Sequence, residues 1–168
     1  MNPEIVERIE TDAAAFAARH RDAAGALLDI RTSSAAAVAG LLDAADSRIA
    51  DIALNLINSG YFGLPRNAKS IPHAHEMMGG ERLAQAVLAA WAHDLLSAPL
   101  SGYDLPAGDL WRHALGVSIA SENLAEAVRV DGGQAAFTAG IFHDIGKRVL
   151  GPYVADASDD IERKTEEG

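Results

Sequence analysis

Apolar residues recur along the chain at helical spacing and nowhere alternate for long with polar residues, as they do in half-buried strands. One segment shows the spacing i, i+3, i+4, i+7 and i+8 that defines one face of a helix: Ile49, Ile52, Ala53, Leu56 and Ile57. Alanine, the best helix former, is the commonest residue, and runs of β-branched residues are scarce. The pattern predicts an all-α fold.

Capping and helix-breaking residues divide this pattern into separate helices. The predicted helices cover about residues 3–19, 22–30, 33–45, 47–57, 70–78, 81–97, 109–129 and 131–144. We expect Asp109 to cap one of them, Asp131 with Gln134 to form a capping box for the next, and Gly146 to help end it. The result would be a compact multi-helix bundle in one domain over residues 1–152. An acidic tail at 153–168 would form a frayed or partly ordered helix.

Charge and composition exclude several classes of function. Acidic residues outnumber basic residues by 24 to 14, which gives a formal net charge of −10. Because nucleic-acid binding needs clustered Lys and Arg, we expect no nucleic-acid partner. No apolar run is long enough to cross a membrane, and the charged first ten residues are unlike a signal peptide. The absence of cysteine removes disulfides and thiolate chemistry, and a reducing cytoplasm is the simplest location.

Histidine is the residue type that could carry chemistry, and four of the six histidines stand in unpromising contexts. His20 lies in a charged stretch typical of a solvated surface. His73 and His75 are two residues apart, which turns them in different directions on a helix, although an extended segment could chelate a metal. His93 precedes Asp94 inside an amphipathic helix, where an ordinary exposed or packed pair is expected.

The pair His143-Asp144 differs because it lies at the predicted end of an apolar helix. Imidazole and carboxylate together suit a divalent metal such as Mn, Fe, Zn or Mg. Two antiparallel helices would bring His113, near the start of the preceding helix, beside this pair. The three residues therefore form a candidate, incomplete metal site, and Lys147 could meet a phosphate oxygen. The alternative is that His113 is a core histidine and that Asp144 caps the turn, and spacing alone leaves both interpretations open.

Four segments, in order along residues 22–150, resemble the HDOD domain, an HD-related output domain of bacterial signalling proteins. They are Asn58–Pro65 (NSGYFGLP), Ser70-Ile71 with Met77–Gly80, Leu110–Leu115 (LWRHAL) and Phe137–Lys147, which ends in HDIGK. The resemblance implies an all-α bundle in a bacterial cytoplasmic signalling protein that acts through contacts with other signalling proteins. Typical members of the family continue with further helices, so the chain would be C-terminally short.

The active HD enzymes resemble the pattern His…His-Asp…Asp, and only the first three positions map here, onto His113, His143 and Asp144. The acidic tail offers no convincing fourth ligand, and the Gly-Tyr-Pro segment of cyclic-dinucleotide phosphodiesterases is absent. Two hypotheses follow. The first is a non-catalytic interaction domain without a cofactor, in which an exposed apolar surface contacts partners or forms a homodimer. The second is a metal-dependent phosphohydrolase acting on a nucleotide or another phosphate ester. We expect the first.

Overall fold

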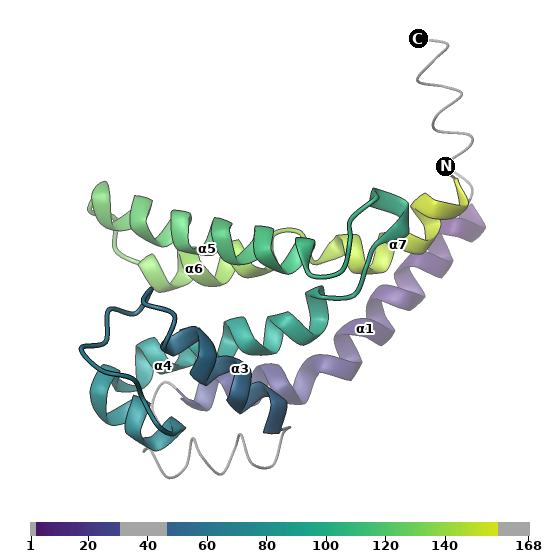
Figure 1. Cartoon of the computed structure of the whole chain (residues 1–168). Helices are drawn as coiled ribbons and strands as arrows, with labels where there is room; N and C mark the ends of the chain where they lie inside the picture. Colours follow the sequence, from purple (N-terminus) through teal and green to yellow (C-terminus); the bar gives the residue numbers. More distant parts are fainter. Residues whose placement is uncertain (1–2, 31–46, 158–168) are drawn as a thin grey trace. The chain divides into compact units, whose positions relative to one another are not determined.

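The computed structural model describes residues 3–30 and 47–157, and the regular secondary structure of these ranges is helical, as predicted (Figure 1). The helices are α1 (Pro3–Ile30), α3 (Ser47–Ile57), α4 (Ile71–Leu96), the short 3₁₀ helix η1 (Ser101–Tyr103), α5 (Asp109–Ala127), α6 (Gly133–Phe142) and α7 (Gly146–Asp156). The chain divides into two compact units, residues 20–93 and residues 1–19 with 94–168. None of the helices described is long and apolar enough to cross a membrane.

Most predicted helices are confirmed, with one merger and one break. The helices expected at 3–19 and 22–30 are a single helix, α1, because the charged residues between them include no glycine or proline. The helices expected at 70–78 and 81–97 are joined in α4, but Gly79 interrupts the helix with a φ of 79° and a ψ of 168°. Only glycine adopts this conformation at low cost, so the predicted division falls at this residue. The helix expected at 33–45 lies outside the described residues.

The unit of residues 20–93 is built on α3 and α4. Its core contains the predicted apolar face of α3, with Ile57 fully buried, and Leu83 and Val87 of α4. The loop after α3 is held by Asn58, whose side chain accepts a hydrogen bond from the Ala68 nitrogen at 2.8 Å and donates one to the Ala68 oxygen at 3.0 Å. This two-way bond closes the loop around the buried Phe62. The segment that resembles the HDOD signature is therefore a structural element of this core.

The other unit is organised by the pair α5 and α6, which lie side by side (Figure 1). The two helices come into direct backbone contact where Gly140 of α6 meets Ser118 of α5. A Cβ atom at position 140 would lie 2.5 Å from the Ser118 Cα atom and 2.7 Å from its nitrogen, closer than side chains can pack. Ser118 is fully buried and its hydroxyl donates a hydrogen bond to the Ala114 oxygen at 2.8 Å, so no polar group is left unpaired at the contact.

Helix α7 is fastened at two places within the same unit. It packs against η1, and at its far end the Tyr153 hydroxyl donates a hydrogen bond to the Asp12 carboxylate at 2.7 Å. The guanidinium of Arg8 lies over the Tyr153 ring, 5.4 Å from its centre. The first half of α1 is therefore tied to residues near the start of the predicted acidic tail, and residues 153–156 of that tail are helical.

Three of the predicted helix boundaries are wrong. Gly108, with a φ of 83°, is the N-cap of α5, and Asp109 is the first helical residue, paired with Arg112. The predicted capping box at Asp131 does not form, because Gly132 is the N-cap of α6 and no side chain caps that end. Gly146 does not end α6 but begins α7. Both N-cap positions have a positive φ, which glycine adopts at low cost. A glycine therefore occupies each N-cap, and the acidic residue beside it does not.

The contact at Gly140 gives the first prediction. Gly140→Ala should lower the free energy of unfolding by about 3 kcal/mol, since the new methyl group meets backbone atoms that cannot move aside without separating the helices. The measurement is urea denaturation followed by circular dichroism. The matched control is Gly116→Ala, also inside a helix, where a Cβ meets no described atom within 4 Å; it should be neutral or stabilise by up to about 1 kcal/mol. Equal effects of the two substitutions would contradict the close contact.

Candidate functional site

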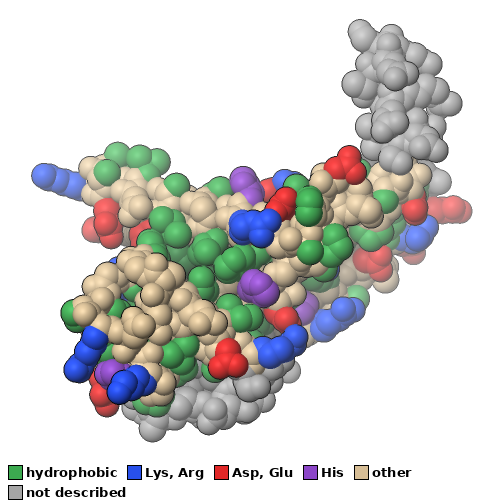
Figure 2. Space-filling view, in the orientation of Figure 1, with side chains coloured by type: hydrophobic (Ala, Val, Ile, Leu, Met, Phe, Trp, Pro, Cys, Tyr) green, Lys and Arg blue, Asp and Glu red, His purple; other side chains and the backbone are tan. Residues whose placement is uncertain are grey.

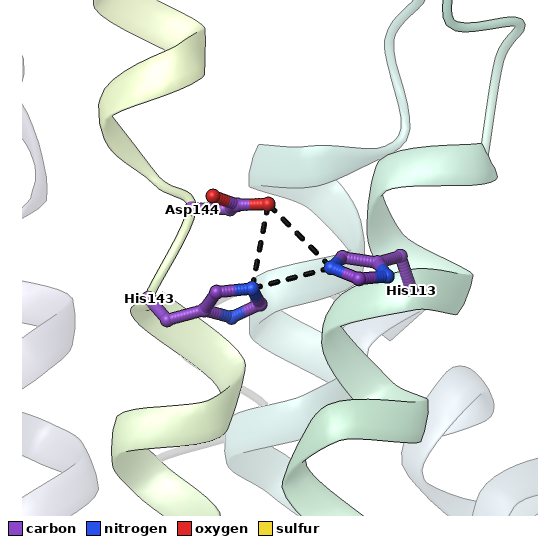
Figure 3. Close-up of side chains that lie close together, drawn as sticks. All are labelled: His113, His143 and Asp144. Carbon is purple, nitrogen blue, oxygen red and sulfur yellow. Dashed lines mark hydrogen bonds and ion pairs between the residues drawn. The ribbon is translucent and has the colours of Figure 1, made fainter.

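Helices α5 and α6 bring His113, His143 and Asp144 together at one point (Figure 3). The Nε2 atoms of His113 and His143 are 3.2 Å apart. One carboxylate oxygen of Asp144, Oδ2, lies 3.3 Å from His143 Nε2 and 3.5 Å from His113 Nε2. The three residues predicted from the sequence are thus neighbours in space, although His113 is thirty positions from His143.

The His-Asp pair is presented by a tight junction between two helices. Helix α6 ends at Phe142. Two backbone hydrogen bonds of 3.0 Å follow, from the Ile145 N–H to the Phe142 carbonyl and from the Lys147 N–H to the Asp144 carbonyl. The chain therefore keeps right-handed turns from α6 into α7 instead of leaving the helix through a glycine. This geometry turns both side chains of the pair toward α5, as Figure 3 shows.

A backbone hydrogen bond sets the tautomer of His143. Its Nδ1 atom lies 2.8 Å from the Gly140 oxygen, one turn earlier in α6. A carbonyl oxygen can only accept, so Nδ1 must carry the hydrogen. In the neutral ring Nε2 then presents its lone pair to Asp144 and His113. A carbonyl partner of this kind is what commonly orients a metal-ligating histidine.

Asp144 is the electrostatic centre of the cluster. The Lys147 ammonium donates a hydrogen bond to Asp144 Oδ2 at 2.6 Å. This bond holds the pKa of the Asp144 carboxyl below its usual value, against the opposing effect of partial burial, and the charges of His143, Lys147 and His113 act in the same direction as the bond. The Asp144 side chain is 22 % exposed and that of His113 is 54 % exposed, so the cluster opens to solvent on the His113 side.

The spacing of the three side chains fits a divalent ion. Two ligand atoms that are each about 2.1 Å from one ion lie about 3.0 Å apart at a right angle and about 3.4 Å apart at the tetrahedral angle. The observed separations of 3.2 and 3.3 Å lie inside this range, and that of 3.5 Å lies just above it. Two imidazoles and a carboxylate are also a donor set that Zn, Fe and Mn accept. An ion held here would lower the pKa of a bound water.

The fit is limited by the number of ligands. Among the described residues, no fourth His, Asp or Glu joins the three, and Asp156 at the end of α7 is exposed and not part of the group. Asp159 and Asp160 lie outside the described residues. Metal binding by His113, His143 and Asp144 therefore stays a prediction, as does a phosphate contact by Lys147, whose ammonium is bonded to Asp144 in the structure.

The remaining histidines do not assemble into a site within the described ranges. His73 and His75 lie on α4 rather than on an extended segment, and His73 Nδ1 accepts a hydrogen bond from the Lys69 nitrogen at 3.2 Å. His20 lies next to Trp91, with their ring centres 5.9 Å apart. The chelating alternative for His73 and His75 is wrong because both residues are helical.

Sequence reasoning missed two residues that support the cluster. Gly140 permits the close packing of α5 and α6 and also orients His143 through its carbonyl. A glycine inside an apolar helix can signal such close packing. Tyr103 of η1 places its ring 5.8 Å from the Lys147 ammonium. No pattern in the sequence pointed to it, because the contact depends on how the loop before α5 packs on α7.

The lowered pKa of Asp144 gives a prediction on pH. A carboxyl with a lowered pKa in the folded state stabilises the fold above its unfolded pKa, near 3.8, and loses this effect as the pH falls through the folded value. With a chelator present, Asp144→Asn should cost about 1 kcal/mol of unfolding free energy at pH 7, and this difference should shrink toward pH 3. Urea denaturation at both pH values measures it. A difference that does not depend on pH would show that the charge of Asp144 has no partner.

Comparison with known protein families matches residues 23–168 of the chain to the HDOD domain. No curated protein and no solved structure matches the chain significantly. The family match begins where the resemblance of the sequence motifs begins, and it extends past residue 150 through the acidic tail. It covers most of the chain, and the helical structure agrees with it. The chain therefore belongs to the HDOD family.

Proposed function

We propose that the chain is a bacterial cytoplasmic signalling domain that acts through contacts with other signalling proteins and does not catalyse a reaction. Membership of the HDOD family supports a role in signalling. The observation that carries the proposal is an exposed apolar cluster at the C-terminal end of α5, formed by Leu124, Val128 and Val130. Their exposed fractions are 63 %, 59 % and 60 %. Figure 2 shows hydrophobic side chains gathered at this end of α5.

The end of α5 holds these three side chains in a defined arrangement. The Val130 nitrogen donates to the Ala125 oxygen at 3.0 Å and the Arg129 nitrogen donates to the Glu126 oxygen at 3.1 Å. This is the hydrogen-bond pattern of a Schellman motif, in which the residue after the helix end packs on a residue of the last turn. The motif brings Val130 toward Leu124, and Val128 lies one turn after Leu124 on the same face. The cluster is thus a fixed surface on a helix end.

Arg129 adds a second argument for an interaction surface. It occupies the left-handed position of the motif with a φ of 55°, a place where glycine is usual. An arginine there costs about 1 kcal/mol relative to glycine. Strain of this kind is commonly retained where a side chain has a function, and arginine beside exposed aliphatic residues is a frequent anchor of protein interfaces. The described structure gives Arg129 no other evident use.

The proposal predicts which substitutions abolish signalling. Val128→Asp should reproduce the gene-expression changes caused by deleting the gene, while Asp144→Asn should behave like the wild type. Transcript profiles of a deletion strain carrying each variant measure this. Asn123→Asp, an exposed position on the same helix about 100° around its axis from Leu124, is the control for the added charge. Both surface variants should change stability by less than about 0.5 kcal/mol. Loss of the response in Asp144→Asn but not in Val128→Asp would overturn the proposal.

A metal-dependent phosphohydrolase is the second candidate function, and the spacing of His113, His143 and Asp144 is the observation that favours it. Hydrolysis needs an activated water, a group that neutralises the phosphate and a base. In the part of the chain that is described, Lys147 is the cation nearest the cluster, and it is bonded to Asp144.

The two candidates are separated by a turnover assay. We expect no release of nitrophenol from p-nitrophenyl phosphate or its diester, and no release of phosphate from nucleotides, above the level of His143→Ala. The assay is made with Mn, Fe(II) or Mg in excess. Turnover that depends on both His143 and a metal would favour the phosphohydrolase and contradict the non-catalytic proposal.

A further inference from the structure

One carboxylate oxygen of Asp144 is shared by all its partners in the cluster. The Lys147 ammonium lies 2.6 Å from Oδ2, and the same oxygen faces the Nε2 atoms of His143 and His113 at 3.3 and 3.5 Å. A metal ion held by the two imidazoles and Asp144 would use this oxygen. The ammonium is therefore bonded to the atom that a metal would need.

Two further contacts keep Lys147 in this position. Its backbone nitrogen donates a hydrogen bond to the backbone carbonyl oxygen of Asp144, so the two residues are held one turn apart at the start of α7. Its ammonium also lies 5.8 Å from the centre of the Tyr103 ring, at a distance where a cation is attracted to the aromatic face. Tyr103 belongs to η1, which packs on α7. The position of the ammonium is thus fixed by a carboxylate, a ring and the local backbone together.

We propose that Lys147 is an internal competitor for the metal: its ammonium is the resident cation of the His113–His143–Asp144 cluster and lowers the affinity of the cluster for divalent ions. The ammonium supplies the positive charge that Asp144 needs, so the cluster is neutralised without an ion. This role goes beyond the proposed signalling function and is independent of it. It also differs from a phosphate contact, because it acts on Asp144 and needs no substrate.

The competition follows from charge and distance. A divalent ion on Oδ2 would lie about 4 Å from an ammonium on the same oxygen, where like charges repel in bulk water and repel several times more at a protein surface. The ion must either tolerate this repulsion or force Lys147 off Asp144, which breaks a charge-assisted hydrogen bond. Removal of the ammonium should therefore raise the affinity for a divalent ion by at least tenfold.

The test is a calorimetric titration of chelator-treated protein with ZnCl₂, made on the wild type and on Lys147→Met. We expect the variant to bind Zn²⁺ at least tenfold more tightly. Arg112→Gln is the matched control, because it removes one positive charge from the residue next to His113, a guanidinium that pairs with Asp109, and it should change the affinity by less than threefold. Adding His143→Ala to Lys147→Met should abolish the gain, which assigns the gain to this cluster rather than to other histidines.

A second readout covers the metal-free protein. If the ammonium is the resident cation, Lys147→Met should lower the melting temperature in chelator, and Zn²⁺ should restore it in the variant more than in the wild type. Lys147→Gln, which keeps a polar side chain, should show the same direction if Lys147→Met does not fold. Unchanged or weaker Zn²⁺ binding in the Lys147 variants, or an equal gain in Arg112→Gln, would overturn the proposal. Neither result depends on the signalling output or on turnover.

Discussion

The backbone contact between α5 and α6 at Gly140 is the constraint on which the candidate site depends. Ser118 follows His113 by five residues and Gly140 precedes His143 by three, so in an antiparallel pair the two histidines lie on the same side of the contact. At a rise of 1.5 Å per residue they stand about 7.5 Å and about 4.5 Å along their helices from it. The remaining offset of about 3 Å is within the reach of two imidazoles. Their nitrogens meet at 3.2 Å because the helices touch through backbone atoms.

The close contact between the helices also accounts for how the side chains of the cluster are arranged. The Gly140 carbonyl fixes one imidazole, and the closeness of the helices then forces the second imidazole against it. Asp144 enters from the junction after α6 and places one oxygen opposite both rings. Such a cluster would carry an unpaired negative charge unless a cation joined it, and a partly buried unpaired carboxylate is costly. Lys147, one turn later, is the cation that the described chain supplies.

Much of the fold was predictable because helix propensity and apolar spacing act locally. The α3 stripe ending at Ile57 and the break at Gly79 follow from single segments read alone. The juxtaposition of His113 with His143 followed from one topological assumption, a short antiparallel connection. The predicted cap at Asp131 failed because a glycine stood beside it, and either residue can begin a helix. A sequence pattern does not show which of two neighbouring residues caps a helix when both residue types can do so.

Contacts between residues that are far apart in the chain could not be predicted from the sequence pattern. The partner of Gly140 is Ser118 on another helix, and nothing near Gly140 in the chain identifies it. In the same way, the position of Tyr103 over Lys147 depends on η1 packing against α7. The sequence suggested only that Lys147 could meet a phosphate, because a pattern shows the lysine without its neighbours in space, and that contact stays a prediction. The structure shows that the ammonium has a partner inside the chain, and this contact is the basis of the proposal that Lys147 competes with a metal ion.

The two notable regions of this unit differ in the free energy that a ligand can gain there. In the cluster, each polar group named above already has a partner, and an ion bound by Asp144 would have to tolerate the ammonium on that carboxylate or displace it. At the end of α5 the situation is reversed. Leu124, Val128 and Val130 expose most of their surface, and full burial of one aliphatic side chain is worth about 1.5–3 kcal/mol. The helix end also needs no rearrangement, because its hydrogen bonds are made in advance. A partner that covers the apolar cluster would therefore meet no competing contact among the described residues, whereas an ion that enters the histidine cluster would compete with the Lys147 ammonium, and this difference supports the proposed interaction surface.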